Sequence, residues 1–175
     1  MIASRNDEFF AAVGRVFSSW SVLEDLMCQW FTQVLDGQQN ETGGALRRVF
    51  NTAKSFSSKR DLLNAVVLDM PDDSIRQFLD RALDKAAQYS GFRNRLAHDL
   101  YVAVPMSGGD VMEIRKQRKP NARDEAITLE ELKAAHQRIG QLNLLLLQVL
   151  ARTRTPDDAM QELGQMPKSA DSSSQ

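Results

Sequence analysis

Apolar side chains recur every three or four residues along most of the chain, which is the period of an α-helix. The first such segment covers residues 7–35 and stops at the polar, glycine-containing residues 37–40. Its apolar positions are Phe9, Phe10, Val13, Phe17, Trp20, Leu23, Met27, Trp30, Phe31 and Val34. A long helix with one aromatic-rich face predicts a buried element, packed in a core or at a subunit interface.

Three further helices follow before residue 100. A short one is expected over residues 45–51, after the Gly43-Gly44 pair. Ser58 precedes Asp61 at capping-box-like spacing, which predicts a helix that opens there and runs toward Met70. A break at residues 69–72 then leads to a long helix that begins near Asp72 or Asp73 and extends to His98.

The pattern changes after this helix. Residues 101–104 have β-type composition, residues 107–110 form a turn signal and residues 111–114 suit a return strand, so we expect a small β-hairpin or a loop. Thr128 and Glu131 have capping-box spacing and predict a last helix over residues 129–152. Its second half is apolar nearly all round, which predicts burial on every side, part of it against a partner subunit.

These elements predict an all-α fold: an up-and-down bundle of four to five helices with a small β-hairpin or loop insertion after the fourth helix. Residues 1–153 would form one helical domain. The polar, serine-rich segment 154–175 would be a disordered C-terminal tail.

Composition narrows the function classes. The 175 residues carry a net charge of −1, which argues against non-specific coating of nucleic acid. Cys28 is the single cysteine, in an apolar helical pattern, and is interpreted as a buried, inert thiol. With two histidines and no zinc spacing, we expect no metal and no cofactor. Since no signal peptide or membrane-spanning run is found, a cytoplasmic protein is expected.

The candidate chemistry gathers in Arg93, Asn94 and His98. Arginine is a forked cation suited to phosphate, and histidine can move a proton near neutral pH. Asn94 and His98 are four residues apart, so the amide could orient the imidazole. Arg93 and His98 are separated by roughly 140° around a straight helix. Either the helix bends or ends at Ser90-Gly91, or, as we favour, a second copy of the chain supplies the missing half of the site.

The residues 93–98, Arg-Asn-Arg-Leu-Ala-His, resemble the Arg-polar-x3-His motif of the HEPN (higher eukaryotes and prokaryotes nucleotide-binding) superfamily. Its setting is similar too: residues 20–24, the helix entry at residues 55–59 and a leucine-rich last helix. The resemblance spans roughly residues 7–153. It implies an all-α homodimer with two Arg/His motifs in one cleft, and a metal-independent endoribonuclease of a toxin or defence type, with an antitoxin or nucleotidyltransferase partner. Some relatives only bind nucleotides or other proteins.

Three further side chains are accessory candidates: Glu24 as an ion-pair partner for Arg93, Asp99 as a neighbour of His98, and Tyr101. A toxin branch of the family carries a modified tyrosine two residues after its histidine. Tyr101 lies three residues after His98, so that role is not carried over. A dense basic segment lies at the far end of the predicted hairpin. It is either an exposed basic loop or, if it lies near the cleft, a surface that would bind an RNA backbone: Arg115, Lys116, Arg118, Lys119 and Arg123.

Two other interpretations of the same residues stay open. The chain could be a non-catalytic HEPN-like dimer that binds a nucleotide, an RNA or a protein. It could also be a helical dimer in which Arg93 is only a buried ion-pair residue.

Two other polar positions are interpreted as surface features. Arg95 and Asp99 have the spacing of a surface salt bridge, and His136 is interpreted as a surface histidine.

Overall fold

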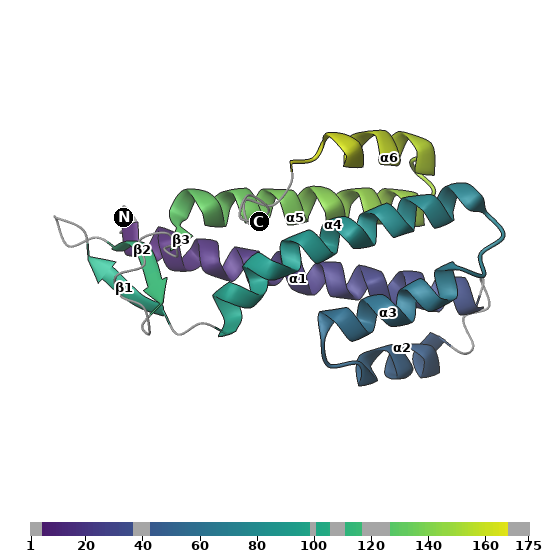
Figure 1. Ribbon diagram of the computed structural model, residues 1–175, viewed down its shortest axis with the longest axis horizontal. Coiled ribbons are helices and arrows are strands. Elements are labelled where there is room, and N and C mark those ends of the chain that lie inside the picture. The colour runs from purple at the N-terminus through teal and green to yellow at the C-terminus, as the bar shows by residue number, and fades with distance from the viewer. Residues whose placement is uncertain (1–4, 37–42, 99–100, 106–110, 117–126, 168–175) are drawn as a thin grey trace, which may run out of the picture.

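The computed structural model of the chain describes residues 5–36, 43–98, 101–105, 111–116 and 127–167. These residues form a helical bundle with a small sheet at one end (Figure 1). The helices are α1 (Arg5–Asp36), α2 (Gly43–Thr52), α3 (Phe56–Val67), α4 (Asp73–His98), α5 (Leu129–Leu150) and α6 (Pro156–Gln165). Successive helices alternate in direction, so the predicted up-and-down bundle is confirmed (Figure 1), with six helices in the described residues where four to five were expected.

Local capping explains where the helices begin. The predicted capping box of α5 is present: the Thr128 amide donates to Glu131 Oε2 at 2.7 Å, and the Glu131 amide donates to Thr128 Oγ1 at 3.2 Å. The predicted Ser58 cap of α3 is wrong. Ser55 is the capping residue, because its extended backbone lets Oγ accept the Ser58 amide at 3.1 Å.

The predicted hairpin follows α4. Strand β1 (Tyr101–Pro105) pairs antiparallel with β2 (Val111–Lys116), and β2 pairs with a two-residue strand, β3 (Ile127–Thr128). The sequence did not indicate β3. Its Ile127 is fully buried, so this short strand ties the sheet to the bundle immediately before α5.

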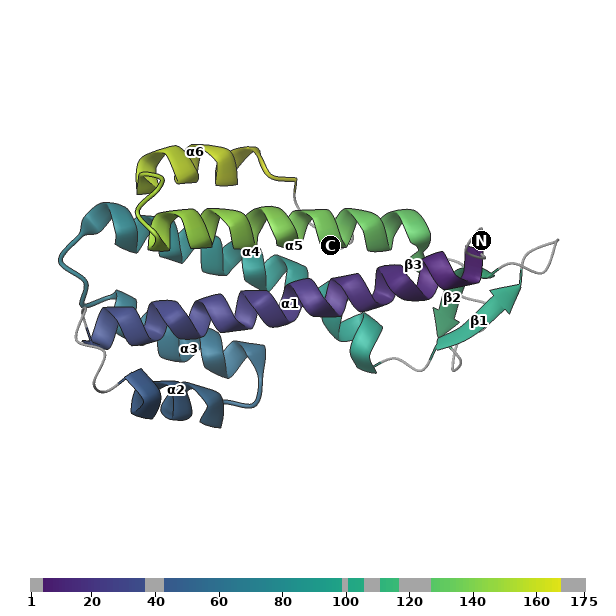
Figure 2. The same cartoon turned by 180° about the vertical axis from the view of Figure 1, so that it is seen from behind.

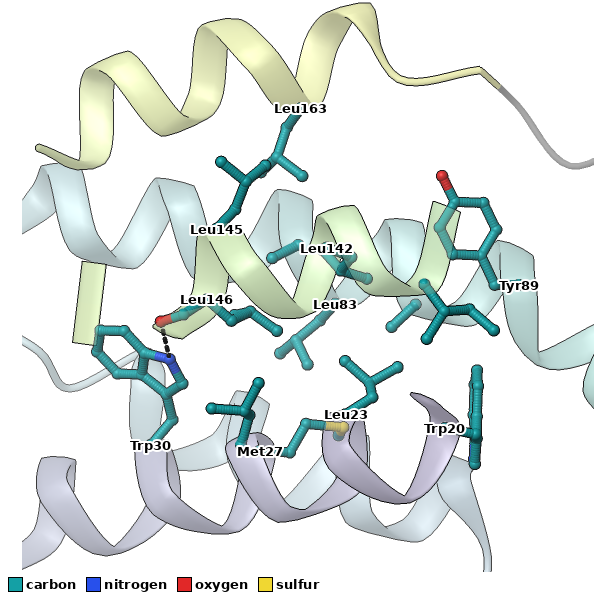
Figure 3. Close-up of a cluster of buried hydrophobic side chains, with 14 of the residues drawn as sticks. Trp20, Leu23, Met27, Trp30, Leu83, Tyr89, Leu142, Leu145, Leu146 and Leu163 are labelled. Atoms are coloured by element: carbon teal, nitrogen blue, oxygen red, sulfur yellow. Dashed lines mark hydrogen bonds between the residues drawn. The ribbon is translucent and has the colours of Figure 1, made fainter. Parts of the chain in front are cut away.

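The core lies between α1, α4 and α5 (Figure 3). Leu23 and Met27 of α1 are completely buried, as are Leu142 and Leu145 of α5. Trp30 packs into the same cluster, and its indole Nε1 donates to the Leu146 carbonyl at 3.3 Å. The helical spacing of apolar residues therefore identified most inward-facing positions of these helices; Phe10, predicted on the buried face of the first helix, is instead 57% exposed.

The predicted disorder from residue 154 is wrong for the stretch that forms α6. Thr155 caps this helix by accepting the Asp158 amide at 3.2 Å, and Pro156 occupies its first turn. Ala159 and Leu163 are buried against the bundle. Burial of this apolar face, together with the cap, explains why a polar segment is ordered; residues 168–175 lie outside the described part.

The apolar second half of α5 is not buried on every side within one chain. Leu163 of α6 covers Leu145 (Figure 3), whereas Leu144 and Leu147 stay about half exposed, at 51% and 48%. Covering of these two leucines by a second subunit remains a prediction.

His136 is not a simple surface residue, which corrects the sequence interpretation. Its Nδ1 lies 2.7 Å from Oγ of the buried Ser19, across the interface between α5 and α1. Asn143 donates from Nδ2 to the Ser19 carbonyl at 2.8 Å in the same interface. These polar contacts fix the relative position of two helices that are far apart in sequence.

Candidate functional site

The candidate motif lies at the end of the bundle that carries the sheet. The last turns of α4, the first half of α1, the start of α5 and the hairpin gather there (Figure 2). Helix α4 continues through Ser90 and Gly91 to His98, and its last turns bend away from α5 (Figures 1 and 2). Both Arg93 and His98 therefore belong to one helix, with the motif at its C-terminal end.

Arg93 lies within the buried stripe of α4. Ala82, Ala86 and Tyr89 are buried at helical spacing, and Leu96 is buried three residues after Arg93. Arg93 lies at the same helical spacing, and its side chain is half-buried. Its Nε is buried without a hydrogen-bond partner among the described residues.

The guanidinium is held from two sides. Its Nη1 donates to Asn94 Oδ1 at 3.3 Å. Its Cζ lies 6.0 Å from the ring centroid of Phe17 on α1, a cation–π contact. Phe17 is a site residue that the sequence interpretation assigned only to the apolar face of the first helix. The apolar helical spacing predicts that Phe17 is buried, but it does not predict the contact with the guanidinium of Arg93.

His98 is the last residue of α4, five residues after Arg93. On a helix this spacing corresponds to roughly 7.5 Å along the axis and 140° around it. The His98 side chain and the whole of Asp99 lie outside the described residues. Asn94 is exposed and contacts Arg93, so its carbonyl oxygen orients the guanidinium.

Arg95 points to a different neighbour. Its Cζ lies 5.4 Å from the ring centroid of Phe92, one turn earlier on α4. Because Asp99 is outside the described part, the expected Arg95–Asp99 salt bridge stays a prediction.

The predicted ion pair between Glu24 and Arg93 is wrong. Glu24 Oε1 accepts from the indole of Trp20 at 2.9 Å, and Oε2 accepts from Lys59 Nζ of α3 at 2.5 Å. Both carboxylate oxygens are thus occupied at the α1–α3 contact. Arg93 instead lies over Phe17, two turns earlier on α1.

The strand register brings two of the predicted basic residues toward the motif. Lys116 pairs with Tyr101, and Arg115 pairs with Val102. Paired strand residues have Cα atoms about 5 Å apart, and the three residues from His98 to Tyr101 span at most about 11 Å. The Cα atoms of Lys116 and His98 are therefore within about 16 Å. The side chains of Tyr101, Arg115 and Lys116 lie outside the described part, as do residues 118, 119 and 123 entirely.

The rest of the described chain adds no metal-binding group. No cluster of three histidine, cysteine or acidic side chains that could hold a metal ion occurs in residues the structure describes. Cys28 is buried, and burial raises the pKa of its thiol while nearby Arg47 lowers that pKa in part.

No described helix is both long and apolar enough to traverse a bilayer. Comparison of the chain with protein-family models, curated proteins and solved structures finds no significant match.

Proposed function

We propose that the chain is a metal-independent endoribonuclease whose site is built on the C-terminal turns of α4. One observation carries the proposal: Arg93 is a half-buried cation without an ion pair to any described residue. A guanidinium in that position favours an anion, and phosphate oxygens match its forked donors. The HEPN-like motif at residues 93–98 supplies the class of reaction.

The reaction is an internal transesterification of RNA. His98 removes the proton of a ribose 2′-hydroxyl, and the 2′-oxygen attacks the adjacent phosphorus. Arg93 stabilises the charge on the phosphorane, aided by Asn94, which fixes the guanidinium. The 5′-oxygen of the next nucleotide leaves and takes up a proton from water, and the imidazolium of His98 returns its proton to solvent, so the products carry a 2′,3′-cyclic phosphate and a 5′-hydroxyl. DNA lacks the attacking hydroxyl and should not be cut.

A second copy of the chain completes this site in the proposal. Their spacing separates Arg93 and His98 by roughly 140° around a helix, so in the proposal the guanidinium of one chain and the imidazole of the other act on one phosphate. Arg115 and Lys116 at the base of the hairpin would hold the flanking RNA backbone. A toxin or defence role follows from the resemblance, with an antitoxin or nucleotidyltransferase as the partner.

The test is an RNA cleavage assay in EDTA with the full chain. Cleavage should continue in EDTA, fall at least about 100-fold in His98→Ala, and fall similarly in Arg93→Lys, which cannot reproduce the forked contact. Arg81→Ala is the matched control, because Arg81 is exposed on the same helix. Full cleavage by His98→Ala, or complete loss in EDTA with intact folding, would refute the proposal.

A non-catalytic RNA-binding dimer is the second candidate. The angular separation of Arg93 and His98 on one helix favours it, since a phosphate clamp needs only the arginine. RNA that binds to the wild-type chain and not to Arg93→Ala, yet is recovered intact after long incubation, would establish this alternative.

A further inference from the structure

A cavity of about 340 Å³ opens at the end of the bundle opposite the motif. It lies where α1, α3 and α5 end and α4 begins, and Ile75 in its wall is about 27 Å from Arg93 along α4. Its apolar walls are Trp30, Val34, Val66, Met70, Ile75 and Val149. The cavity is therefore separate from the candidate nuclease site.

The cavity has the size and lining of a small-molecule site. Trp30 donates its only polar hydrogen to the Leu146 carbonyl, so its ring offers the cavity an apolar surface (Figure 3). Met70 adds a flexible thioether, which adapts to ligand shape. An apolar cavity of about 150 Å³ is enough to bind benzene, so this one has room for a large apolar side chain and its attached polar groups.

Two opposite charges line the same cavity. Asp69 follows α3 and Arg152 follows α5, and both side chains are exposed. They form no ion pair with each other, nor with any other side chain in the described part of the chain. Among the described residues, the cavity thus presents a carboxylate and a guanidinium that have no ion-pair partner, beside apolar walls.

The backbone of Arg152 gives a separate reason to assign its side chain a role. Its φ is +56°, in the left-handed region, directly after the C-cap of α5. Glycine is the usual residue there because a β-carbon is strained in this conformation. An arginine in this position is sterically strained, whereas a glycine would not be. The side chain of this strained residue lines the cavity.

We propose that this cavity binds a free α-amino acid with a large apolar side chain. The ligand carboxylate would pair with Arg152, its ammonium group with Asp69, and its side chain would pack against Trp30 and Val66. A simple acid would leave Asp69 facing an anion, and a simple amine would leave Arg152 facing a cation. Only a ligand that carries both charges satisfies both residues.

Calorimetric titration of the full chain tests the ligand class. L-Phenylalanine or L-leucine should bind, whereas glycine should not, because it lacks the apolar group. 3-Phenylpropanoate and phenethylamine each lack one charge and should bind at least about 10-fold more weakly than L-phenylalanine. Equal binding of either analogue, or no binding of any apolar amino acid, overturns the proposal.

Two variants test the charged residues. Arg152→Gly removes the guanidinium and relieves the backbone, so its melting temperature should rise while its affinity for the amino acid falls about 10- to 100-fold. Asp69→Asn should lose affinity similarly, and Asp80→Asn, an exposed control on α4, should not. Unchanged affinity in a well-folded Arg152→Gly protein refutes the assignment, whatever the outcome of the RNA assays.

Discussion

Arg93 occupies a position that the helical repeat of α4 would give to an apolar side chain. Tyr89 and Leu96 are buried one turn before and after it. Its Nε makes no hydrogen bond with described residues, and an unsatisfied buried donor costs on the order of 1 kcal/mol or more. Such a residue reduces the stability of the fold unless its guanidinium binds a ligand. This trade-off between stability and function is expected of a binding or catalytic group.

Replacing Arg93 by leucine separates these roles. Arg93→Leu should leave the free energy of unfolding unchanged or raise it by up to about 1 kcal/mol, because an apolar side chain suits the buried stripe and no buried donor remains. RNA cleavage should be lost. Urea denaturation and the cleavage assay measure the two effects. A loss of more than about 2 kcal/mol would instead show that Arg93 holds the bundle together.

Cys28 predicts a loss of stability at alkaline pH. Burial raises the pKa of its thiol above the ordinary value of 9.0, so the unfolded chain releases this proton at lower pH than the folded chain. The stabilisation is fully present below pH 9.0 and is lost as the pH rises through the higher pKa of the folded state. Urea denaturation at several pH values should show a steeper decline above pH 9 for the wild type than for Cys28→Ala. Equal slopes would contradict this.

Glu24 shows what residue-level inference from sequence misses. The prediction rests on the need of an arginine beside apolar positions for a partner, which is sound chemistry. Whether a given carboxylate can be that partner depends on how the helices pack. Glu24 forms its ion pair with Lys59 of α3 instead. His136 is a similar case, since its partner Ser19 lies 117 residues away.

At the scale of elements, strong local signals predicted structure well. The amphipathic spacing predicted α1, α4 and α5, and the Thr128–Glu131 pair marked the start of α5. The short helix α6 was missed because only Ala159, Leu163 and Met166 are buried in and just after it. Its signal was Thr155-Pro156-Asp157-Asp158: a capping residue, a first-turn proline and two acidic residues.

Replacing Leu163 measures how much the packing of α6 contributes to the free energy of unfolding. Leu163→Ala should reduce the free energy of unfolding by about 2–4 kcal/mol, because the side chain is buried where α6 packs on α4 and α5. Leu68→Ala, just after α3, is the matched control, with 73% of the residue exposed, and should cost less than about 1 kcal/mol. Thermal or urea denaturation compares the two. Equal, small effects would mean that α6 docks only weakly.

For the whole molecule, the alternating helices place different chemistry at the two ends of the bundle. The motif and hairpin lie at one end, and the cavity with Asp69 and Arg152 lies at the other. The sequence indicated the first because its residues are close together along the chain. The second could not be predicted, because its walls come from the ends of four helices spread between Trp30 and Arg152.

The parallel pairing of α1 with α5 has a consequence during protein synthesis. Helix α1 is made first, but the helix that lies along it begins only at Leu129. At about 5–20 residues per second, the ribosome needs roughly 5–20 s to add the intervening residues. Until then the side of α1 that α5 covers, which includes Leu23 and Met27, stays uncovered, so the nascent chain cannot close its core before residues 129–150 have been made.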